Sequence, residues 1–220
     1  MKKFLTCLLI AMLGLVVCGF TFFSDDDSDT FDINDLYDYQ KEFKSEELSV
    51  CSANDAKTYM DYRMTTLVSS RQYQFLNYEC TVDKKTGFLY DKDGFIAVAL
   101  GSYYGEIGDR FYFTLDSGIV LPLVKGEEKD DGDTDGTNCY HTIDGSVIEF
   151  VIHDDYAADY FGANGNGYVL NGNYNNYSLF EGSIVKVERV LDEKNDKMVT
   201  YKSQMQLPND VDIFNYASGY

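Results

Sequence analysis

Residues 95–124, FIAVALGSYYGEIGDRFYFTLDSGIVLPLV, carry the strongest secondary-structure signals of the chain. They open with a continuous apolar run, Phe95 to Leu100, which has the length and composition of a buried strand. Two further runs, Arg110 to Leu115 and Ile119 to Val124, are joined by Asp116-Ser117-Gly118. Apolar runs joined by a short turn that contains Gly predict a β-hairpin. The centre of the chain is therefore predicted to be β structure.

Weaker strand signals lie on both sides of this centre. From about residue 72, aromatic and apolar residues alternate with polar ones, which predicts a strand that includes Tyr73, Phe75 and Cys80. Further strands are predicted at Val147–Ile152, Ser183–Val190 and Met198–Met205. Short strands at this spacing predict a mainly β fold, a small barrel or sandwich, over residues 72–206, with a tail at 207–220.

The segment before residue 72 has a different character. Asp25 to Asp29 is a run of like charges and predicts a solvated spacer. Residues 31–48 carry apolar side chains at partly helical spacing, with Asn34 or Asp35 available as a cap. The sequence predicts a spacer with a short helical extension over residues 25–71.

The N-terminal residues 1–24 form an expected export segment. Lys2 and Lys3 precede an apolar run from Phe4 to Phe23, the pattern that secretion machinery recognises. Three fates remain open: lipidation at Cys18 as in a bacterial lipoprotein, an uncleaved membrane anchor, or cleavage and free secretion. All three place the rest of the chain outside the cytoplasm, because flanking lysines favour the inner side.

Charge and composition exclude some functions. The chain has 37 acidic and 18 basic residues, a net charge of −19, so no basic surface is available to neutralise nucleic-acid phosphates. An apolar content of 45% is enough to form a core. Abundant Tyr and Phe agree with β structure.

The cysteines outside the export segment are Cys51, Cys80 and Cys139. In an oxidising compartment two of them can pair and one is left over. The chain has no C-x-x-C motif, and its two histidines, His141 and His153, are twelve residues apart, so the sequence does not support a zinc site.

The acidic loop after the hairpin resembles half of a calcium-binding loop. Asp131, Asp133 and Asp135, with Gly136, match D-x-D-x-D-G, where carboxylates two residues apart converge on a cation. Thr142 stands at the twelfth position, where a bidentate Glu would be expected. Two interpretations remain: a single Ca²⁺ site, or a solvated Asp/Gly turn. We expect the protein to require no other cofactor.

The stretch from Tyr78 to Ile152 resembles the double-psi β-barrel proteins of bacterial cell walls: the rare lipoprotein A type, the three-aspartate domain, and membrane-bound lytic transglycosylase A. The segments that carry the resemblance, in order, are Tyr78-Glu-Cys-Thr81, Ala97-Val-Ala-Leu100, Ile107-Gly108 before Arg110-Phe-Tyr-Phe113, Leu123-Val-Lys-Gly-Glu127 and Ser146-Val-Ile-Glu-Phe-Val151. The resemblance covers about a third of the chain. It implies a small double-psi-type β-barrel.

The family's three aspartates fall on positions where this sequence differs. The first falls at Ala99, so this carboxylate is missing. The other two fall at Glu127 and Glu149, each one methylene longer than Asp. The spacing of 22 residues from Glu127 to Glu149 exceeds the family spacing, and the additional residues are the acidic loop.

The resemblance implies cleavage of peptidoglycan glycan strands by a single carboxylic acid that later acts as a base. It assigns this role to Glu149, with Glu127 holding or tuning it and Asp130, Asp135 or His141 assisting from the loop. Ordinary alternatives exist: an outward-facing strand residue for Glu149, a turn carboxylate for Glu127 and packing for His141.

Three functions therefore compete for an extracytoplasmic protein, tethered or secreted. The first is a lytic transglycosylase-like enzyme. The second is a non-catalytic barrel that binds peptidoglycan or a surface protein, which the missing carboxylate at Ala99 favours. The third is a calcium-stabilised surface protein without wall activity.

Overall fold

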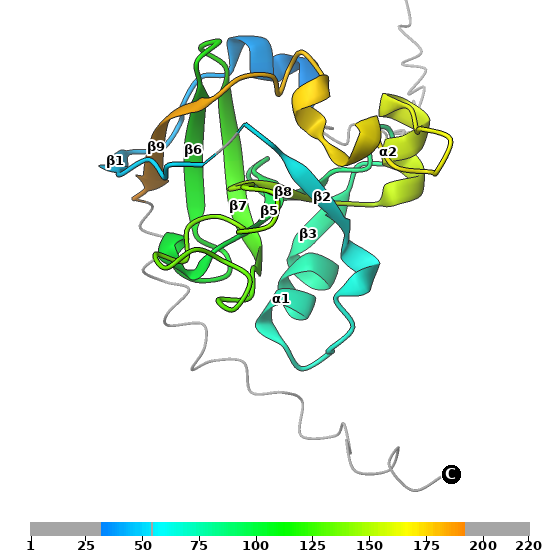
Figure 1. Cartoon of the computed structure of the whole chain (residues 1–220), viewed down its shortest axis with the longest axis horizontal. Helices are drawn as coiled ribbons and strands as arrows, with labels where there is room; N and C mark the ends of the chain where they lie inside the picture. The colour runs from blue at the N-terminus through cyan, green and yellow to red at the C-terminus, as the bar shows by residue number, and fades with distance from the viewer. Residues whose placement is uncertain (1–31, 54, 192–220) are drawn as a thin grey trace, which may run out of the picture. The chain divides into compact units, whose positions relative to one another are not determined.

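Strand β5 (Ile96–Leu100) lies at the centre of a mixed sheet of nine strands (Figure 1). The computed structural model describes residues 32–53 and 55–191. The described strands run in the order β1-β9-β6-β7-β5-β4-β3, and β8 pairs with both β5 and β2. The other strands are β1 (Ser45–Leu48), β2 (Thr58–Asp61), β3 (Cys80–Val82), β4 (Leu89–Asp91), β6 (Arg110–Leu115), β7 (Val120–Glu128), β8 (Glu149–Ile152) and β9 (Ile184–Val190).

Helical segments are short and lie between strands. The longest among the described residues is α2 (Asp154–Phe161), and α1 (Arg71–Gln74) continues into a π-helical turn, η3 (Phe75–Glu79). The 3-10 helices are η1 (Ile33–Asp38), η2 (Tyr62–Met64), η4 (Ser102–Tyr104), η5 (Leu170–Gly172) and η6 (Tyr174–Asn176).

All five residues of β5 are buried, which explains its uninterrupted apolar sequence. It pairs in parallel with β7 and in antiparallel orientation with β8 and, at Ile96, with β4. Alternate side chains enter two apolar clusters. Ile96, Val98 and Leu100 join the larger cluster, whereas Ala97 joins the smaller one.

The hairpin of β6 and β7 forms as the sequence predicts. Phe111 pairs with Leu123 and Phe113 with Leu121, and these side chains enter the larger cluster. Tyr112, one residue out of phase, joins the smaller cluster on the opposite face. The strands predicted at Phe95–Leu100, Val147–Ile152 and Ser183–Val190 are also confirmed, as β5, β8 and β9.

Two local predictions differ from the structure. The strand expected from residue 72 begins only at Cys80, because residues 71–79 form α1 and η3, which bury Phe75 and Leu76. The helix expected over residues 31–48 is limited to η1, and residues 45–48 form β1, which pairs with β9. Strands β1 and β2 both lie in the segment expected to be a spacer and helical extension. This segment therefore contributes two strands to the sheet.

The described part of the chain is mainly β and forms one mixed sheet. This sheet does not close into a barrel, so a double-psi barrel is not confirmed. The export segment (residues 1–24), residues 25–31, the strand expected at Met198–Met205 and the tail at 207–220 lie outside the described residues. Within residues 32–53 and 55–191, no helix is long and apolar enough to cross a membrane.

Cys51 and Cys139 form a disulfide, and Cys80 remains free. The bond joins the segment between β1 and β2 to the acidic loop, across 88 residues of sequence. The buried Tyr104 hydroxyl lies 3.0 Å from the Cys51 Sγ and 3.4 Å from the Cys139 Sγ. The disulfide therefore anchors the acidic loop to the larger apolar cluster.

Replacing Cys51 and Cys139 together by Ser should lower the free energy of unfolding by about 2–5 kcal/mol, because the unfolded chain loses a long covalent loop. Urea denaturation of the full chain measures this difference. A reductant should destabilise the wild type and leave the double variant unchanged. Equal sensitivity of both proteins to the reductant would contradict a structural role for this bond.

Candidate functional site

Three positions on adjacent strands form the candidate site. Ala99 on β5 pairs with Glu127 on β7 and, across its other edge, with Glu149 on β8. The two glutamates expected to carry the chemistry, 22 residues apart in sequence, thus flank one buried alanine. All three positions that the family resemblance aligned with aspartates lie in this row.

An irregularity in register places Glu127 in the row. Val98 pairs with Lys125, but the next residue, Ala99, pairs with Glu127, so Gly126 has no partner on β5. A Cβ at Gly126 would lie 2.8 Å from Leu76 and 3.3 Å from Ala97, which leaves no room for a side chain. This glycine therefore permits the close approach of η3 to β7 beside the site.

The Glu127 carboxylate is largely shielded from solvent, and its hydrogen-bond donors among the described residues are both neutral. It accepts hydrogen bonds from the Thr65 hydroxyl at 3.1 Å and the Gln72 amide at 3.3 Å. Burial raises the pKa of Glu127 to about 7, the Thr65 hydrogen bond acts against this rise, and the charge of Glu149 adds to it. This carboxyl group therefore titrates near neutral pH.

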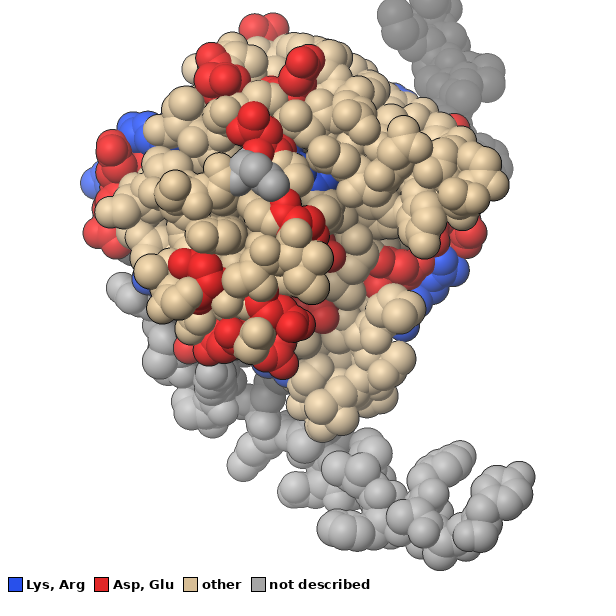
Figure 2. Space-filling model, viewed as in Figure 1, with Lys and Arg blue, Asp and Glu red and all other residues tan. Residues whose placement is uncertain are grey.

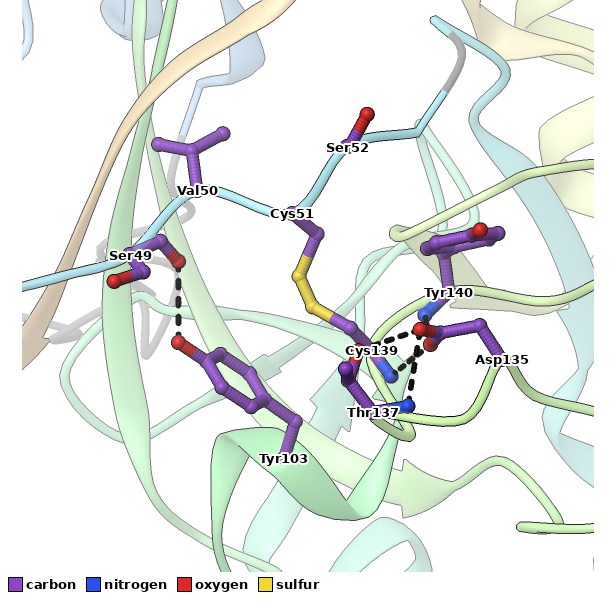
Figure 3. Close-up of a pocket in the computed structure, with 9 residues that line it drawn as sticks. All are labelled: Ser49, Val50, Cys51, Ser52, Tyr103, Asp135, Thr137, Cys139 and Tyr140. Atoms are coloured by element: carbon purple, nitrogen blue, oxygen red, sulfur yellow. Dashed lines mark hydrogen bonds between the residues drawn. A yellow bond between two sulfur atoms is a disulfide. The ribbon is translucent and has the colours of Figure 1, made fainter.

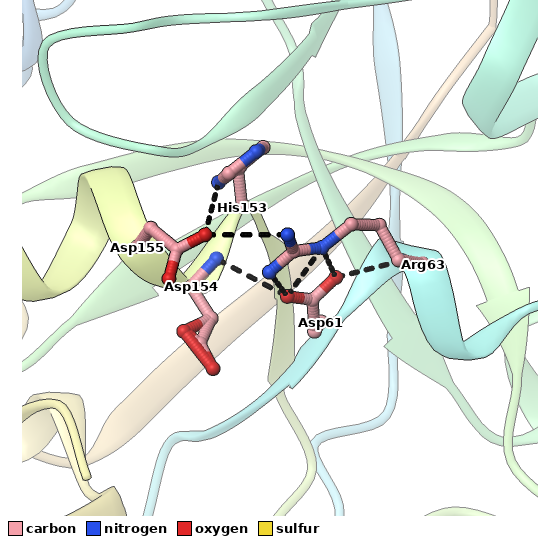
Figure 4. Close-up of polar contacts among 5 residues, drawn as sticks. All are labelled: Asp61, Arg63, His153, Asp154 and Asp155. Atoms are coloured by element: carbon pink, nitrogen blue, oxygen red, sulfur yellow. Dashed lines mark hydrogen bonds and ion pairs between the residues drawn. The ribbon is translucent and has the colours of Figure 1, made fainter. Parts of the chain in front are cut away.

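A polar cluster fixes the segment that supplies Thr65 (Figure 4). The guanidinium of Arg63 lies between two carboxylates, bonded through Nε to Asp61 at 2.9 Å and through Nη1 to Asp155 at 3.2 Å. The Asp61 side chain also caps η2 by accepting from the Arg63 backbone amide at 2.8 Å. These bonds join the end of β2 to the start of α2. Arg63, which makes them, lies two residues before Thr65.

Glu149 is placed beside a buried cation. The Lys129 Nζ lies 3.8 Å from the Glu149 Oε2 and donates to the Ser146 carbonyl and hydroxyl oxygens at 3.1 and 3.0 Å. Burial lowers the pKa of Lys129, and the charges of Glu149 and Asp144 oppose this. The two glutamates therefore have different partners: neutral donors for Glu127 and an ammonium group for Glu149.

His141 reaches this arrangement indirectly. Its Nδ1 lies 3.1 Å from the Asp144 Oδ1, which also accepts from the Ser146 amide at 2.9 Å. Burial acts to raise the pKa of Asp144, but the hydrogen bonds from Ser146 and His141 outweigh it and leave the pKa lowered. Asp144 thus remains negative, and its charge favours the ammonium form of Lys129.

The surface around the site combines acidic and apolar parts. In Figure 2, acidic side chains gather over the loop after β7, beside a lobe without charge that occupies the place of α1 and the preceding segment. Met64, Leu67 and Val68 in that segment are 74%, 67% and 60% exposed. The site is therefore bordered by exposed apolar side chains on one side and by carboxylates on the other.

Aspartates of the acidic loop accept hydrogen bonds from backbone amides of the same loop. Asp135 accepts from the backbone amides of Thr137, Cys139 and Tyr140, and Asp130 accepts from the Gly132 amide. In the described part of the chain, no three His, Cys, Asp or Glu side chains are grouped so as to hold a metal ion. The expected calcium site at Asp131, Asp133 and Asp135 is therefore not established.

The structure brings together some of the residues expected from the sequence. Glu127 and Glu149 lie on either side of Ala99, and His141 pairs with Asp144, whose charge acts on the Lys129 that contacts Glu149. Asp130 and Asp135 make no contact with either glutamate among the described residues.

Sequence reasoning missed Thr65, Gln72 and Lys129. Only Lys129 carried a signal, a basic residue two positions after Glu127 in an acidic stretch.

Comparisons with family models, with curated proteins and with solved structures gave no match for this chain. The interpretation of the site therefore depends on its geometry and chemistry.

Glu127→Gln should stabilise the protein at pH 8 relative to the wild type, by about 2 kcal/mol. The folded-state pKa of about 7 lies above the ordinary value of 4.5, so the folded protein retains a proton that the unfolded chain has lost. The wild type should therefore lose stability as the pH rises from about 4.5 to 7, whereas the Gln variant lacks this contribution. Urea denaturation across this pH range measures it.

Glu46→Gln is the matched control, because Glu46 is exposed on β1. It should leave the pH dependence of stability unchanged. A Glu127→Gln variant with the same pH dependence as the wild type would show that this carboxyl group titrates normally.

Proposed function

We propose that the protein is an extracytoplasmic enzyme that cleaves peptidoglycan glycan strands, with Glu127 as general acid and base. The observation that carries this proposal is the asymmetric pair: Glu127, with its pKa raised to about 7, lies beside the charged Glu149. A carboxyl group that is protonated near neutral pH can donate that proton to a leaving oxygen. The proposal exchanges the roles that the sequence suggested for the two glutamates.

The reaction needs one proton-transfer group. Glu127 donates its proton to the glycosidic oxygen as the bond to the anomeric carbon breaks. The Glu127 carboxylate then takes the proton from the sugar's own 6-hydroxyl as that oxygen bonds to the same carbon. No water is consumed, and the product carries an internal anhydro ring.

Glu149 and Lys129 complete the arrangement. The negative charge of Glu149 stabilises the positive charge that develops on the sugar ring. Lys129, held by Ser146 at two oxygens, fixes the position of the Glu149 carboxylate. The ammonium group compensates the cost of placing Glu149 next to a second acid.

Two further observations support the proposal. The three positions aligned with the cell-wall family lie in one row across β7, β5 and β8, which brings the two carboxylates of the resemblance to one part of the sheet. The disulfide between Cys51 and Cys139 is typical of proteins outside the cytoplasm, in agreement with an exported chain, tethered or secreted.

Incubating the purified full chain with peptidoglycan sacculi should release anhydro-muropeptides, detected by mass spectrometry. Glu127→Gln should lower the rate at least 100-fold, because it cannot donate or accept the proton. The wild-type rate should fall above about pH 7 as Glu127 loses its proton. Absence of product from folded wild type at high protein concentration would refute the enzymatic proposal.

Lys129→Met should lower the rate and move the alkaline limb of the pH profile to higher pH. Without the ammonium group, ionising both carboxylates costs more, so the pair retains its proton longer. Lys129→Arg should restore part of the rate and the original profile. A lower rate with an unchanged profile would indicate a purely structural role for Lys129.

A second candidate is a protein that binds peptidoglycan without cleaving it. Ala99 favours it, because this methyl group occupies the position of one of the three family carboxylates. Retention of the wild type on sacculi without anhydro products, and equal retention of Glu127→Gln, would support this second function.

A further inference from the structure

A hollow of about 370 Å³ opens at the disulfide, formed by the segment after β1, by η4 and by the acidic loop (Figure 3). Its volume lies within the range of small-molecule sites in proteins. The rings of Tyr103 and Tyr140 stand on opposite sides of the disulfide. Tyr103 is 40% exposed, so its ring is accessible to a ligand.

The wall of the hollow is rigidly held. Both oxygens of Asp135 are engaged, one by the amide and hydroxyl of Thr137 and the other by the amides of Cys139 and Tyr140. The Tyr103 hydroxyl donates to the Ser49 carbonyl at 3.3 Å, which connects η4 with the segment after β1. A site with such fixed walls loses little entropy when a ligand binds.

The polar groups left for a ligand are hydroxyls. Ser49, Ser52 and Thr137 line the hollow, and both tyrosine hydroxyls can accept further hydrogen bonds. No described lining residue is basic, whereas Asp135 is negative. The hydrogen bond from the Thr137 hydroxyl, with those from three backbone amides, lowers the pKa of Asp135 to about 2, so the negative charge persists at all physiological pH values.

We infer that this hollow binds an uncharged sugar ring of a glycan. A pyranose has an apolar face that packs on an aromatic ring and an edge of hydroxyl groups that bind to hydroxyls, which matches two tyrosines among serines and threonine. An acidic sugar is disfavoured by the Asp135 charge. The choice of glycan as probe rests on the proposed function, but the binding itself does not require catalysis.

The acidic loop connects this hollow with the carboxylate pair. The hollow is lined by Asp135, Thr137, Cys139 and Tyr140 of this loop, and the two ends of the same loop supply Lys129 and Ser146 beside Glu149. The middle of this loop therefore lines the hollow, and its two ends lie beside Glu149. The hollow would hold one part of the glycan strand, away from the glycosidic bond that is cleaved at Glu127.

Binding is tested with an uncharged N-acetylglucosamine tetrasaccharide, titrated by calorimetry into the full-length Glu127→Gln protein. We expect saturable binding. Tyr103→Leu and Tyr140→Leu should each weaken it at least tenfold, because the aromatic face is lost. Tyr103→Phe, which keeps the ring, should weaken it less than threefold, and Tyr168→Ala, at an exposed tyrosine outside the hollow, should not change it.

A glucuronate-containing oligosaccharide of the same length should bind at least tenfold more weakly than the uncharged one. No saturable binding, or binding unaffected by Tyr103→Leu and Tyr140→Leu, would overturn the inference. Sugar binding without cleavage of sacculi by the wild type would refute the proposed activity and leave the hollow as a glycan site. Cleavage without binding at the hollow would do the reverse.

Discussion

The pairing of the buried strand β5 with both β7 and β8 determines how the sheet and the candidate site are arranged. Because both faces of β5 are buried, its register relative to the two neighbours is set by packing in both apolar clusters. That register places Ala99 opposite Glu127 and Glu149 at once. The irregular register at Gly126 brings Glu127 into this row, where it accepts hydrogen bonds from Thr65, after η2, and from Gln72 in α1. A slip of one residue would separate the two carboxylates.

Buried lysines hold the loops that surround this sheet. Lys57, Lys125 and Lys129 are nearly inaccessible, although the chain carries an excess of acidic residues. Each ammonium group donates to backbone carbonyls: Lys57 to Asp55 and Gly182, Lys125 to Gly101 and Gly105, Lys129 to Ser146. A buried charge is tolerated only when its donors are satisfied, so each lysine specifies one arrangement of the carbonyls around it. The loops are therefore positioned by internal cations as well as by apolar packing.

Local patterns in the sequence predicted the parts whose structure is decided locally. The apolar runs of β5, β6 and β7 and the turn between the last two are of this kind, since composition and turn residues suffice. The strand predicted over residues 73–79 is wrong, because an alternating pattern over so few positions also fits one helical turn. The helical conformation buries Phe75 and Leu76. The parallel pairing of β2 with β8, and the burial of Lys129, depend on contacts between distant segments. The resemblance supplied the three positions of the row, but not the neutral environment of Glu127 created by Thr65 and Gln72.

The alanine in the row bears on how the two carboxylates divide their roles. Ala99 is almost inaccessible, so a third carboxylate there would lie buried between Glu127 and Glu149. Only one ammonium group, that of Lys129, lies beside this row in the described residues, and it contacts Glu149. A third acid would therefore compete with Glu127 for the single proton that the pair holds near neutral pH. The methyl group avoids a third buried acid, so Glu127 keeps its neutral donors and Glu149 keeps the ammonium group of Lys129.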